Sequence, residues 1–331
     1  MAASFQAVYL EQEDRKTSAS IKTLTTDDLP DSDVLVDVAY STLNYKDGLA
    51  ITGAGKIVRD FPFVPGIDFA GTVVESASDD FAPGDEVILT GFGVGERHWG
   101  GLAGMARVKA KWLVKKPANL SAKDAMAVGT AGFTSMLCVM ALENQGIKPD
   151  QGEIVVTGAS GGVGSVAIPL LKKAGFQVAA STGRASLADY LKSLGADTII
   201  DRNELTEPSK APLASERWAG AVDTVGSETL AGILRATKYH GAVAACGLAG
   251  GFDLPATVFP FILRGVRLVG VDSVYVPQSD RPAVWQRIAD DLNRNLLGEM
   301  TTVRSLADVP AVAPEFLKGQ VQGRVVIDTN A

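Results

Sequence analysis

A glycine-rich segment follows a short apolar run near the middle of the chain. The run at 153–157 leads into GASGGVG at 158–164, and small apolar residues continue from there. Glycines let a backbone turn approach a pyrophosphate closely, and the anion then lies at the positive N-terminus of the next helix. A flexible loop has a similar composition, but a strand before the turn and a helix after it favour dinucleotide binding. The segment therefore predicts a site for a nicotinamide dinucleotide.

The end of the next predicted strand indicates which dinucleotide is bound. Sites for NAD usually carry Asp or Glu about 20 residues after the glycines, where the carboxylate accepts from the ribose 2′-hydroxyl. This chain has Ser181-Thr182-Gly183-Arg184 there instead. Hydroxyls and a guanidinium suit a 2′-phosphate, which a carboxylate would repel. The alternative is that Arg184 is only a surface residue at a helix start; we expect NADPH.

The elements that must hold these residues alternate between strand and helix. A helix is expected at 122–144, and a series of strands and helices follows it: strands at 154–157, 177–181, 198–201, 221–223 and 243–246, helices at 164–174 and 187–194. This alternation predicts a parallel sheet covered by helices on both faces. The region before residue 121 has short strands at 34–38, 69–75 and 86–90, which indicate a compact, partly closed sheet. A last strand at 322–328 is expected to return to that first region.

The composition limits the classes of protein to consider. The chain has 331 residues, 46% hydrophobic and 21% charged, which fits two globular domains. Its formal net charge of −7 disfavours a nucleic-acid partner. With only two cysteines, Cys138 and Cys246, a disulfide framework is excluded and a reducing compartment is expected. Neither a signal peptide nor a run of about 20 apolar residues is recognised, so we expect a cytoplasmic protein with no membrane partner.

Motifs spread along nearly the whole chain carry a family resemblance. They are LNYKDGLAITG (43–53), FPFVPGIDFAGTV (61–73), LTGFGVGERHWGGLA (89–103), GTAGFTSMLCVMALE (129–143), VVTGASGGVG (155–164), DTVG (223–226), ACGLAGGF (245–252) and PFILRGVRLVGVDSV (260–274). The chain resembles the zinc-free, quinone oxidoreductase-like medium-chain dehydrogenase/reductase superfamily. HWGGLA and the last two segments are similar to its acryloyl-CoA reductase (NADPH) subfamily in particular.

The resemblance implies an α/β fold with two domains. A GroES-like β-barrel catalytic domain would span 1–124 and be completed by about 298–331, and a Rossmann NADPH-binding domain with a doubly wound parallel sheet would span 125–297. It also implies reduction of the double bond of acryloyl-CoA to propanoyl-CoA by a homo-oligomer, most simply a dimer. The alternatives are a zinc-free NADPH quinone or enal/enone reductase, or a non-catalytic NADPH-binding protein.

One departure from the wider superfamily concerns metal. Its zinc alcohol dehydrogenases carry Gly-His-Glu where this chain has Gly66-Ile67-Asp68. A catalytic zinc site takes three protein ligands, and the two histidines, His98 and His240, lie at ligand spacing neither to each other nor to the cysteines. We therefore expect no metal, and Asp68 is interpreted as holding its loop.

Without zinc, reduction of an unsaturated thioester needs other groups. Hydride added to the β-carbon leaves negative charge on the thioester oxygen, so the site needs hydrogen-bond donors there and a proton for the α-carbon. Asn44-Tyr45-Lys46-Asp47 would place an amide, a phenol and an ammonium on one loop. The resemblance implies that Tyr45 contacts the cofactor near the nicotinamide, either as proton donor or only to position it. Asn44 is the second expected site residue, while Lys46 and Asp47 could equally form a structural ion pair.

The remaining site residues are carried over by resemblance. The pyrophosphate turn would be Ser160, Gly161, Gly162 and Val163; the 2′-phosphate would meet Thr182, Gly183, Arg184 and Arg202; the nicotinamide end would meet Leu248, Ile262, Ser273 and Asn330. Three arginines, Arg97, Arg264 and Arg267, are candidates for the CoA phosphates, Arg264 first, with a solvated surface charge as the alternative.

Four other residues have plainer interpretations. His98 either contacts substrate or shapes its loop, and His240 is expected to cap a helix end. Cys138 is expected to pack in an apolar helix, and Cys246, near the nicotinamide, is more often structural than functional.

Overall fold

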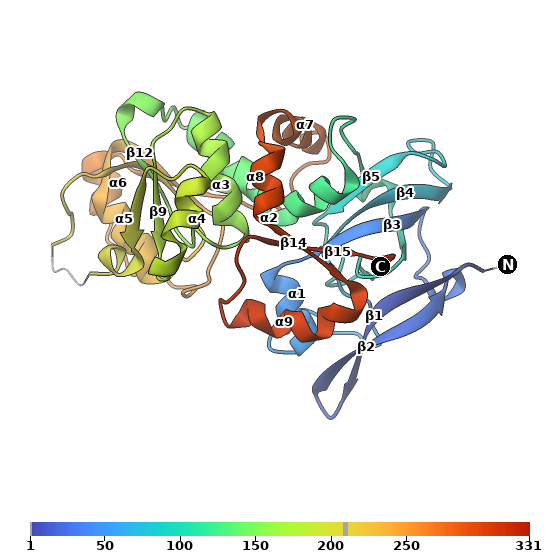
Figure 1. Ribbon diagram of the computed structural model, residues 1–331. Coiled ribbons are helices and arrows are strands. Elements are labelled where there is room, and N and C mark those ends of the chain that lie inside the picture. The colour runs from blue at the N-terminus through green and yellow to red at the C-terminus, as the bar shows by residue number, and fades with distance from the viewer. Residues whose placement is uncertain (1, 208–210) are drawn as a thin grey trace. The chain divides into compact units, whose positions relative to one another are not determined.

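The computed structural model describes residues 2–207 and 211–331, which form two compact units (Figure 1). Unit 1 comprises Met1–Thr130, Ser273–Asp290 and Leu297–Ala331, and unit 2 comprises Ala131–Asp272 and Asp291–Leu296. Both termini therefore belong to the same unit, as a GroES-like domain completed by the C-terminal segment requires.

Unit 1 is built on a seven-stranded sheet in the order β14-β15-β3-β4-β5-β7, with β6 paired to β3. Its strands are β3 (Val34–Leu43), β4 (Asp68–Ser76), β5 (Glu86–Thr90), β6 (Met105–Val108), β7 (Val114–Lys115), β14 (Thr301–Ser305) and β15 (Arg324–Asp328). The last strand, β15, pairs antiparallel with β3, Val325 opposite Leu43. The predicted return of the C-terminal strand to the first region is confirmed.

The sequence did not predict the hairpin of β1 (Ser4–Glu13) and β2 (Lys16–Thr25). Asp14 and Arg15 turn it with φ of 48° and 64°, the backbone of a tight hairpin turn. Unit 1 also contains α1 (Tyr45–Thr52), most of α7 (Arg281–Asp291) and α9 (Val309–Leu317), and α9 packs on α1. The short helix α8 (Arg294–Glu299) begins in unit 2 and ends in unit 1. Val8, Leu10 and Leu43 are buried in the core between hairpin and sheet.

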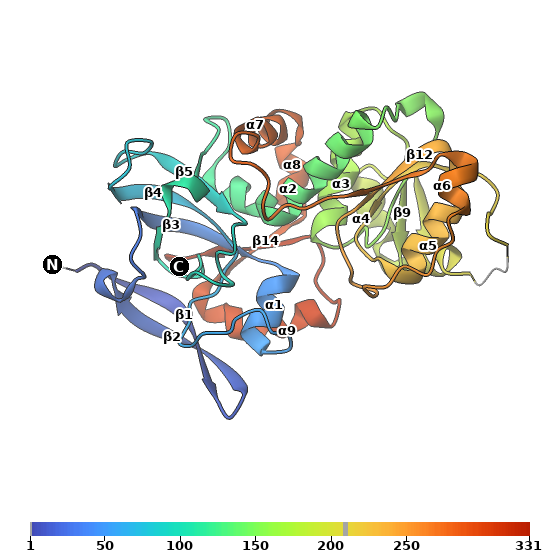
Figure 2. The same cartoon turned by 180° about the vertical axis from the view of Figure 1, so that it is seen from behind.

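Unit 2 has a six-stranded, wholly parallel sheet in the order β10-β9-β8-β11-β12-β13. Its strands are β8 (Ile154–Val156), β9 (Val178–Thr182), β10 (Thr198–Asp201), β11 (Trp218–Asp223), β12 (Thr237–Ala245) and β13 (Arg267–Gly270). Helices α3 (Gly162–Lys173), α4 (Ala188–Ser193), α5 (Ser227–Ala236) and α6 (Phe259–Arg264) flank the sheet on its two sides (Figure 2). This strand order is that of a dinucleotide-binding fold, so the Rossmann prediction is confirmed.

The helix α2 (Ala122–Asn144) runs from unit 1 into unit 2. Gly129 interrupts its regular backbone, with φ of 51° and ψ of −161°. Among the described residues, α2 is the one helix that is long and apolar enough to cross a membrane, and no such helix was expected from the sequence. In its most apolar window, 78% of the residues are buried. Buried core helices of this kind meet the same criterion, so the finding is weak support for a membrane span.

The segment Ser273–Asp290 belongs to unit 1, whereas the sequence assigned 125–297 to the second domain. The physical reason is the buried Arg281, whose Nη1 donates to the Thr90 carbonyl at 2.8 Å and whose Nη2 donates to the Ser273 carbonyl at 3.1 Å. The bond to Thr90 fastens the segment to the end of β5, and the bond to Ser273 holds the segment together.

Candidate active site

The glycine turn of unit 2 has no space for larger side chains. Gly158 has φ of 55°, and a Cβ there would lie 2.3 Å from Thr224 Oγ1. A Cβ on Gly164 would lie 2.5 Å from the Gly158 carbonyl oxygen. Helix α3 begins at Gly162, two residues earlier than predicted, after the N-cap Gly161. The N–H groups of its first turn, including that of Val163, are therefore the unpaired donors at the helix start that suit a pyrophosphate.

A buried polar cluster supports this turn from the neighbouring strand. Thr157 Oγ1 donates to Asp223 Oδ1 at 2.7 Å and accepts from Thr224 N at 2.9 Å. Asp223 Oδ2 accepts from Gly226 N at 2.8 Å, and burial raises the pKa of this carboxyl. The sequence analysis missed Thr157 and Asp223 as site-shaping residues, because only the family segment DTVG pointed to this position.

Three loops at the carboxyl ends of β8, β9 and β10 meet beside the turn. Arg184 Nη2 donates to Ser160 Oγ at 2.8 Å, and Arg184 N donates to Thr182 Oγ1 at 3.1 Å. A Cβ on Gly183 would lie 2.6 Å from Arg202 Nε, so the second guanidinium lies against this glycine. The structure thus brings the four residues that the sequence assigned to the 2′-phosphate next to Ser160 of the pyrophosphate turn. Two guanidinium groups and two hydroxyls there fit a phosphate ester.

A hollow of about 480 Å³ opens at the carboxyl ends of β12 and β13. It is lined by Ala245, Cys246, Gly247, Leu248, Gly270, Val271 and Asp272. Of the residues expected at the nicotinamide end, Leu248 lines this hollow and is 64% exposed. Ile262 is 68% exposed on α6 and does not line it, and Ser273 belongs to unit 1.

The two cysteines contact each other in unit 2. Cys138 is buried on α2, and its hydrogen bond with Cys246 raises the pKa of the Cys138 thiol. Cys246 Sγ also donates to the Asp223 carbonyl at 3.4 Å. The packing interpretation of Cys138 fits this position.

In unit 1 the residues Asn44–Asp47 begin a helix, whereas the sequence placed them on a loop. Asn44 is the N-cap of α1, and Asp47 Oδ2 accepts from Asn44 N at 2.8 Å, which closes a capping box. Tyr45 is the first helical residue and is 50% exposed. Lys46 pairs with Glu96 at 2.8 Å rather than with Asp47. The spacing of Asn44 and Asp47, three residues apart, is the signal in the sequence that could have predicted this short capped helix.

The side chain of Asn44 points into a buried polar network. Its Nδ2 donates to Asp47 Oδ2 at 3.2 Å and to Asp68 Oδ2 at 2.9 Å. Its Oδ1 accepts from Arg324 Nη1 at 3.4 Å. Asp68 Oδ2 also accepts from Thr130 N at 2.8 Å. We call these five residues the Asn44 network; Asp68 does hold its neighbours, but Arg324 was not predicted at all.

Burial dominates the electrostatics of this network. Burial, and then the negative charge of Asp68, raise the pKa of Asp47 to about 7. Burial likewise raises the pKa of Asp68, against the hydrogen bonds from Thr130 and Asn44. Burial lowers the pKa of Arg324 to about 10, although both carboxylates oppose this change. Two buried carboxyls thus lie in the electrostatic field of one buried guanidinium.

The arginines expected at the CoA phosphates differ in their surroundings. Arg264 Nη1 donates to the carbonyls of Arg235 and Thr237 at 3.0 and 3.2 Å, and its Nη2 donates to that of Ala214 at 2.6 Å. These three hydrogen bonds of the guanidinium therefore go to backbone carbonyls of unit 2. Arg97 is an exposed residue of unit 1.

Both histidines have structural surroundings. Arg267 donates to the His240 carbonyl, and His240 lies within β12 with φ of 58° rather than at a helix end, which corrects the capping prediction. His98 contacts the Arg107 carbonyl through Nε2 at 2.6 Å, and burial lowers its pKa. Its ring meets Trp112 edge-on at 5.2 Å, as expected of a residue that shapes its loop.

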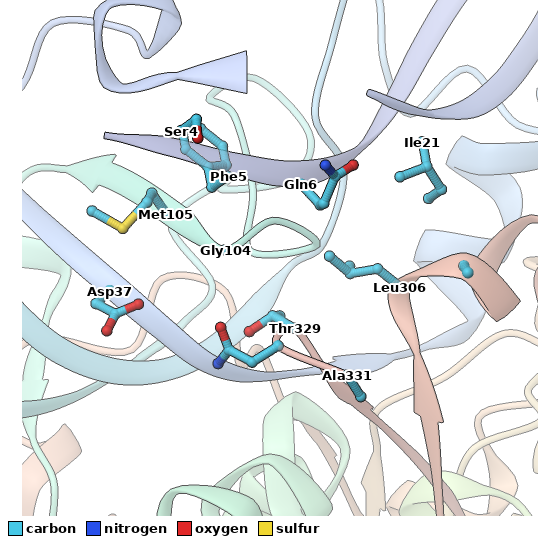
Figure 3. A pocket seen from close by; sticks show the side chains of 12 residues that line it. Ser4, Phe5, Gln6, Ile21, Asp37, Gly104, Met105, Leu306, Thr329 and Ala331 are labelled. Atoms are coloured by element: carbon cyan, nitrogen blue, oxygen red, sulfur yellow. The ribbon is translucent and has the colours of Figure 1, made fainter. Parts of the chain in front are cut away.

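Asn330 lies beside a cavity within unit 1. The cavity has a volume of about 370 Å³, and its lining includes Ser4 and Gln6 of β1, Asp37 of β3 and the tail residues Thr329 to Ala331 (Figure 3). Asn330 N donates to Asp328 Oδ1 at 3.0 Å. The cavity beside Asn330 is thus lined by both polar and apolar side chains, the latter including Phe5, Ile21 and Leu306.

The surroundings of Ile67 and Asp68 decide whether a catalytic zinc ion could bind in this chain. Across residues 2–207 and 211–331, no group of three or more His, Cys, Asp and Glu side chains lies close enough together to hold a metal ion. At the position where zinc relatives carry histidine, Ile67 supplies only its N–H, which donates to Asp47 Oδ1 at 3.0 Å. The neighbouring Asp68 carboxylate accepts from Asn44 and Thr130. The residues present do not fit a catalytic zinc ion.

Two family descriptions match this chain. Residues 162–290 match the zinc-binding dehydrogenase family, and residues 30–118 match the alcohol dehydrogenase GroES-like domain. The first name describes the wider family, because the histidine position of its zinc members is Ile67 here.

Relatives of known name match over the full chain. The acrylyl-CoA reductase AcuI of Ruegeria pomeroyi is 55% identical and covers 97% of each chain. The yhdH oxidoreductase of Salmonella enterica, solved in complex with NADP, is 57% identical with a TM-score of 0.95 over 98% of this chain and 99% of its own. A Bacillus subtilis protein, YhfP, named provisionally as a quinone oxidoreductase, is 48% identical over 99% of each chain. Its crystal structure has NAD bound, with a TM-score of 0.96 over 98% of this chain and 99% of its own.

The fold and the full-length relatives agree with the resemblance found in the sequence. The GroES-like and Rossmann parts match in order, and relatives above half identity cover almost all of the chain. The chain belongs to the medium-chain dehydrogenase/reductase superfamily and, within it, to the acrylyl-CoA reductase family.

Proposed function

We propose that this chain is an NADPH-dependent reductase that converts acryloyl-CoA to propanoyl-CoA. The observation that carries the cofactor choice is the group of hydroxyls and guanidinium groups after β8, β9 and β10, where Arg184 donates to Ser160 at 2.8 Å. The Salmonella relative, solved with NADP, supports the same choice. The acyl-CoA substrate is supported by the name of the Ruegeria pomeroyi relative.

The residues that would hold NADPH follow from the chemistry of its phosphates. The pyrophosphate would accept from the N–H groups of Gly162 and Val163 in the first turn of α3, which lack partners within the helix, while Gly161 N donates to the Gly158 carbonyl at 2.9 Å and lets the backbone approach. The 2′-phosphate would meet Ser160, Thr182, Arg184 and Arg202. A carboxylate in the place of Thr182 or Gly183 would repel that phosphate, which is why this arrangement favours NADPH over NADH.

The reaction itself needs few groups from the protein. Bound NADPH would supply a hydride for the β-carbon of the unsaturated thioester. The chain must then stabilise negative charge on the thioester oxygen and deliver a proton to the α-carbon. Tyr45 offers a half-exposed phenol at the N-terminus of α1, which makes it the candidate for proton delivery and for contact with the nicotinamide. Asn44 contributes by fixing that helix start, since its amide points inward.

The substrate assignment is tested by mixing the purified protein with NADPH and acryloyl-CoA and following both compounds. We expect NADPH consumption with one propanoyl-CoA formed per NADPH, identified by mass spectrometry. Equal kcat/KM with NADH would contradict the cofactor assignment. Turnover of a quinone without turnover of acryloyl-CoA would contradict the substrate assignment.

The role of Tyr45 is tested by Tyr45→Phe, which keeps the ring and removes the hydroxyl. If the phenol delivers the proton, kcat falls about 100-fold while the KM for NADPH changes little. An unchanged maximal rate would remove Tyr45 as an acid and leave only contact with the cofactor. Tyr239→Phe, at an exposed tyrosine of unit 2, is the matched control and should behave as wild type.

A second candidate function is reduction of a quinone or of an enal or enone. The Bacillus subtilis relative, named provisionally as a quinone oxidoreductase, favours it. The same assay with a short-chain quinone in place of acryloyl-CoA separates the two. A higher kcat/KM for the quinone would favour this second function.

We also propose that the protein works in the cytoplasm as a homo-oligomer, most simply a dimer. Strand β13 lies at an edge of the parallel sheet, and Phe252, Val258 and Leu263 nearby in sequence are exposed apolar side chains. Apolar side chains beside an open sheet edge are typical of a subunit interface. Light scattering should give twice the monomer mass, and Leu263→Glu should lower it; a monomer in the unmodified protein would contradict the proposal. The free thiols Cys138 and Cys246 support a reducing compartment.

A further inference from the structure

The side-chain amide of Asn44 has all its hydrogen-bonding groups engaged inside unit 1. Its two N–H donors point to Asp47 and Asp68, and its oxygen accepts from Arg324. An amide has two donors and one acceptor oxygen, so the three partners fix which way the group is flipped. Asn44 therefore has no donor left for a thioester oxygen, and its effect on the reaction must pass through the residue next to it.

Three segments far apart in the sequence meet at this amide. Asp47 comes from α1 itself, Asp68 from the start of β4 and Arg324 from the start of β15. The Arg324 guanidinium also donates to the Ala127 carbonyl at 2.7 Å and to Thr42 Oγ1 at 3.1 Å. Each contact fixes one direction of the helix start, because each partner belongs to a different strand or helix.

The kink in α2 belongs to the same arrangement. A Cβ on Gly129 would lie 2.7 Å from Arg324 Nη2 and 2.8 Å from Asp68 Oδ2. The kinked backbone lets Thr130 donate from its N to Asp68 Oδ2 at 2.8 Å, and Thr130 Oγ1 donates to Asp68 Oδ1. Glycine at 129 is thus what lets the two charged groups approach the helix.

We propose that Asp68 and Arg324 are positioning residues for Tyr45: they hold the Asn44 amide and, with Asp47, fix the first turn of α1, so that the charge state of this buried network sets the position of the phenol. This inference rests on the proposed function for its catalytic consequence, but its structural core does not depend on the substrate. Ionised Asp47 accepts three N–H donors, from Asn44 N, Asn44 Nδ2 and Ile67 N. A proton on either oxygen would displace one of them.

The charged surroundings of Asp47 decide at which pH this happens. Asp68 on β4 raises its pKa, together with burial, to about 7, while Arg324 on β15 carries the opposing positive charge. Next to Asp47 in the sequence, Lys46 is engaged with Glu96. The ionisable side chains of the other elements that pack on α1 lie outside this buried network: Glu315 on α9 is exposed, and on β2 Lys16 is exposed and Lys22 pairs with Glu11. Removal of the Asp68 charge should therefore lower the pH at which Asp47 takes up its proton.

The variant Asp68→Asn tests the proposal while keeping the hydrogen bonds. The new amide oxygen can accept from Asn44 and Thr130 N, and its NH₂ can donate to the Thr130 hydroxyl, which reverses its role. Tyrosine labelled with ¹³C at Cζ gives a resonance for Tyr45, assigned by its loss in Tyr45→Phe. In the wild-type protein we expect this resonance to shift with pH around a midpoint near 7, the value for Asp47. In Asp68→Asn the midpoint should move to lower pH by about one unit or more.

The same pH series is then measured for kcat/KM with acryloyl-CoA. The acid limb of the wild-type profile should rise through the same midpoint, and Asp68→Asn should move it in the same direction. Asp308→Asn is the matched control, because Asp308 accepts from Ser305 at 2.9 Å in an exposed capping box of the same unit. It should change neither the resonance nor the profile.

The outcomes separate this inference from the proposed function. A Tyr45 resonance that ignores pH, or a midpoint unchanged in Asp68→Asn, would overturn the positioning role. A resonance that follows the network in a protein that does not reduce acryloyl-CoA would leave the positioning role intact and overturn the substrate. If Asp68→Asn fails to fold, Thr130→Ser, which keeps the hydroxyl, and Thr130→Val, which removes it, provide the comparison: only the second should move the midpoint.

Discussion

Each unit buries a polar cluster beside its candidate site, and the two clusters contain different kinds of polar group. In unit 2, the Thr157 hydroxyl and the backbone N–H groups of Val225 and Gly226 donate to the single carboxyl of Asp223. In unit 1, the Asn44 network contains two carboxyls and a guanidinium, all buried. The first cluster is satisfied by neutral donors from the ends of neighbouring strands. The second is satisfied only when charged groups from distant segments meet.

This difference teaches where each unit is sensitive. Several neutral donors share the stabilisation of one carboxyl in unit 2, so the loss of one hydrogen bond, worth about 1.5–3 kcal/mol to a charged acceptor, leaves the others in place. A buried ion network depends on every charge, since removal of one partner leaves another uncompensated. We therefore expect unit 1 to respond strongly to charge and pH, and unit 2 to respond to changes in backbone space.

The largest expected effect comes from removing the buried cation of unit 1. Arg324→Met keeps an apolar stem but leaves Asp68 without its guanidinium, and we expect the free energy of unfolding to fall by about 3–5 kcal/mol. Urea denaturation followed by circular dichroism measures it. Arg217→Met is the control in unit 2, where Arg217 pairs with Glu204 at 3.2 Å on the surface, and should cost less than about 1 kcal/mol. Similar losses in the two variants would remove the contrast between the units.

The next effect is the pH dependence of stability in unit 1. Because the folded pKa of Asp47 is raised from 3.8 to about 7, the folded state binds more protons than the unfolded state between these values. Its contribution to stability is therefore present at low pH and is lost as pH rises through 7, by up to about 4 kcal/mol. The difference in unfolding free energy between wild type and Asp47→Asn should fall as pH rises from 4 to 8. A difference that rises with pH would contradict the raised pKa of Asp47 in the folded state.

The third prediction addresses backbone space in unit 2. In Gly164→Ala the new Cβ would meet the Gly158 carbonyl oxygen at 2.5 Å and Ala159 Cα at 2.6 Å. Crowding of this kind costs about 1–3 kcal/mol, so we expect NADPH to bind about tenfold more weakly or worse by calorimetry. Gly298→Ala, where no atom lies within 4 Å of the new Cβ, is the control and should leave binding unchanged. Equal affinity in Gly164→Ala would mean that the turn adapts.

The smallest effect concerns the positive charge of Arg184 in unit 2. We expect this charge to govern the choice between NADPH and NADH rather than the stability of the fold. Arg184→Ala removes the donor to Ser160 and one positive charge of the group that would meet the 2′-phosphate. The ratio of kcat/KM for NADPH over NADH should fall about tenfold, with little change in melting temperature. The exposed Arg304, on β14 of unit 1, offers Arg304→Ala as a charge-matched control. An unchanged ratio would leave Arg202 as the residue that selects the cofactor.

The sequence predicted unit 2 better than unit 1 for a physical reason. The glycine turn, the missing carboxylate after Ser181 and the alternation of strands are local patterns, and each expected strand overlaps one of β8 to β12, although β13 was not expected. The start of α3 at Gly162 could be predicted to within two residues, because the glycines and small residues that mark it are neighbours in the sequence. Local geometry of this kind is written in a short stretch of sequence.

The Asn44 network was beyond such reasoning. Nothing in RVVID indicates that Arg324 turns inward, and nothing near Asn44 reveals that its amide is engaged by side chains up to 280 residues away. Asn44 looked like a donor for substrate because its partners lie on other strands. Arg264 misled in the opposite way: a cation near the end of a helix looked available, while its guanidinium serves three backbone carbonyls.

The return of β15 to β3 has a consequence for how the protein is made on the ribosome. Asn44 is synthesised 280 residues before Arg324. At about 5–20 residues per second, the start of α1 waits tens of seconds for its guanidinium. During that interval the two carboxyls of unit 1 lack the cation that compensates them, whereas the sheet of unit 2, complete at Gly270, can already close. The nucleotide-binding half is therefore ready first, and the chemistry becomes possible only when the last strand emerges.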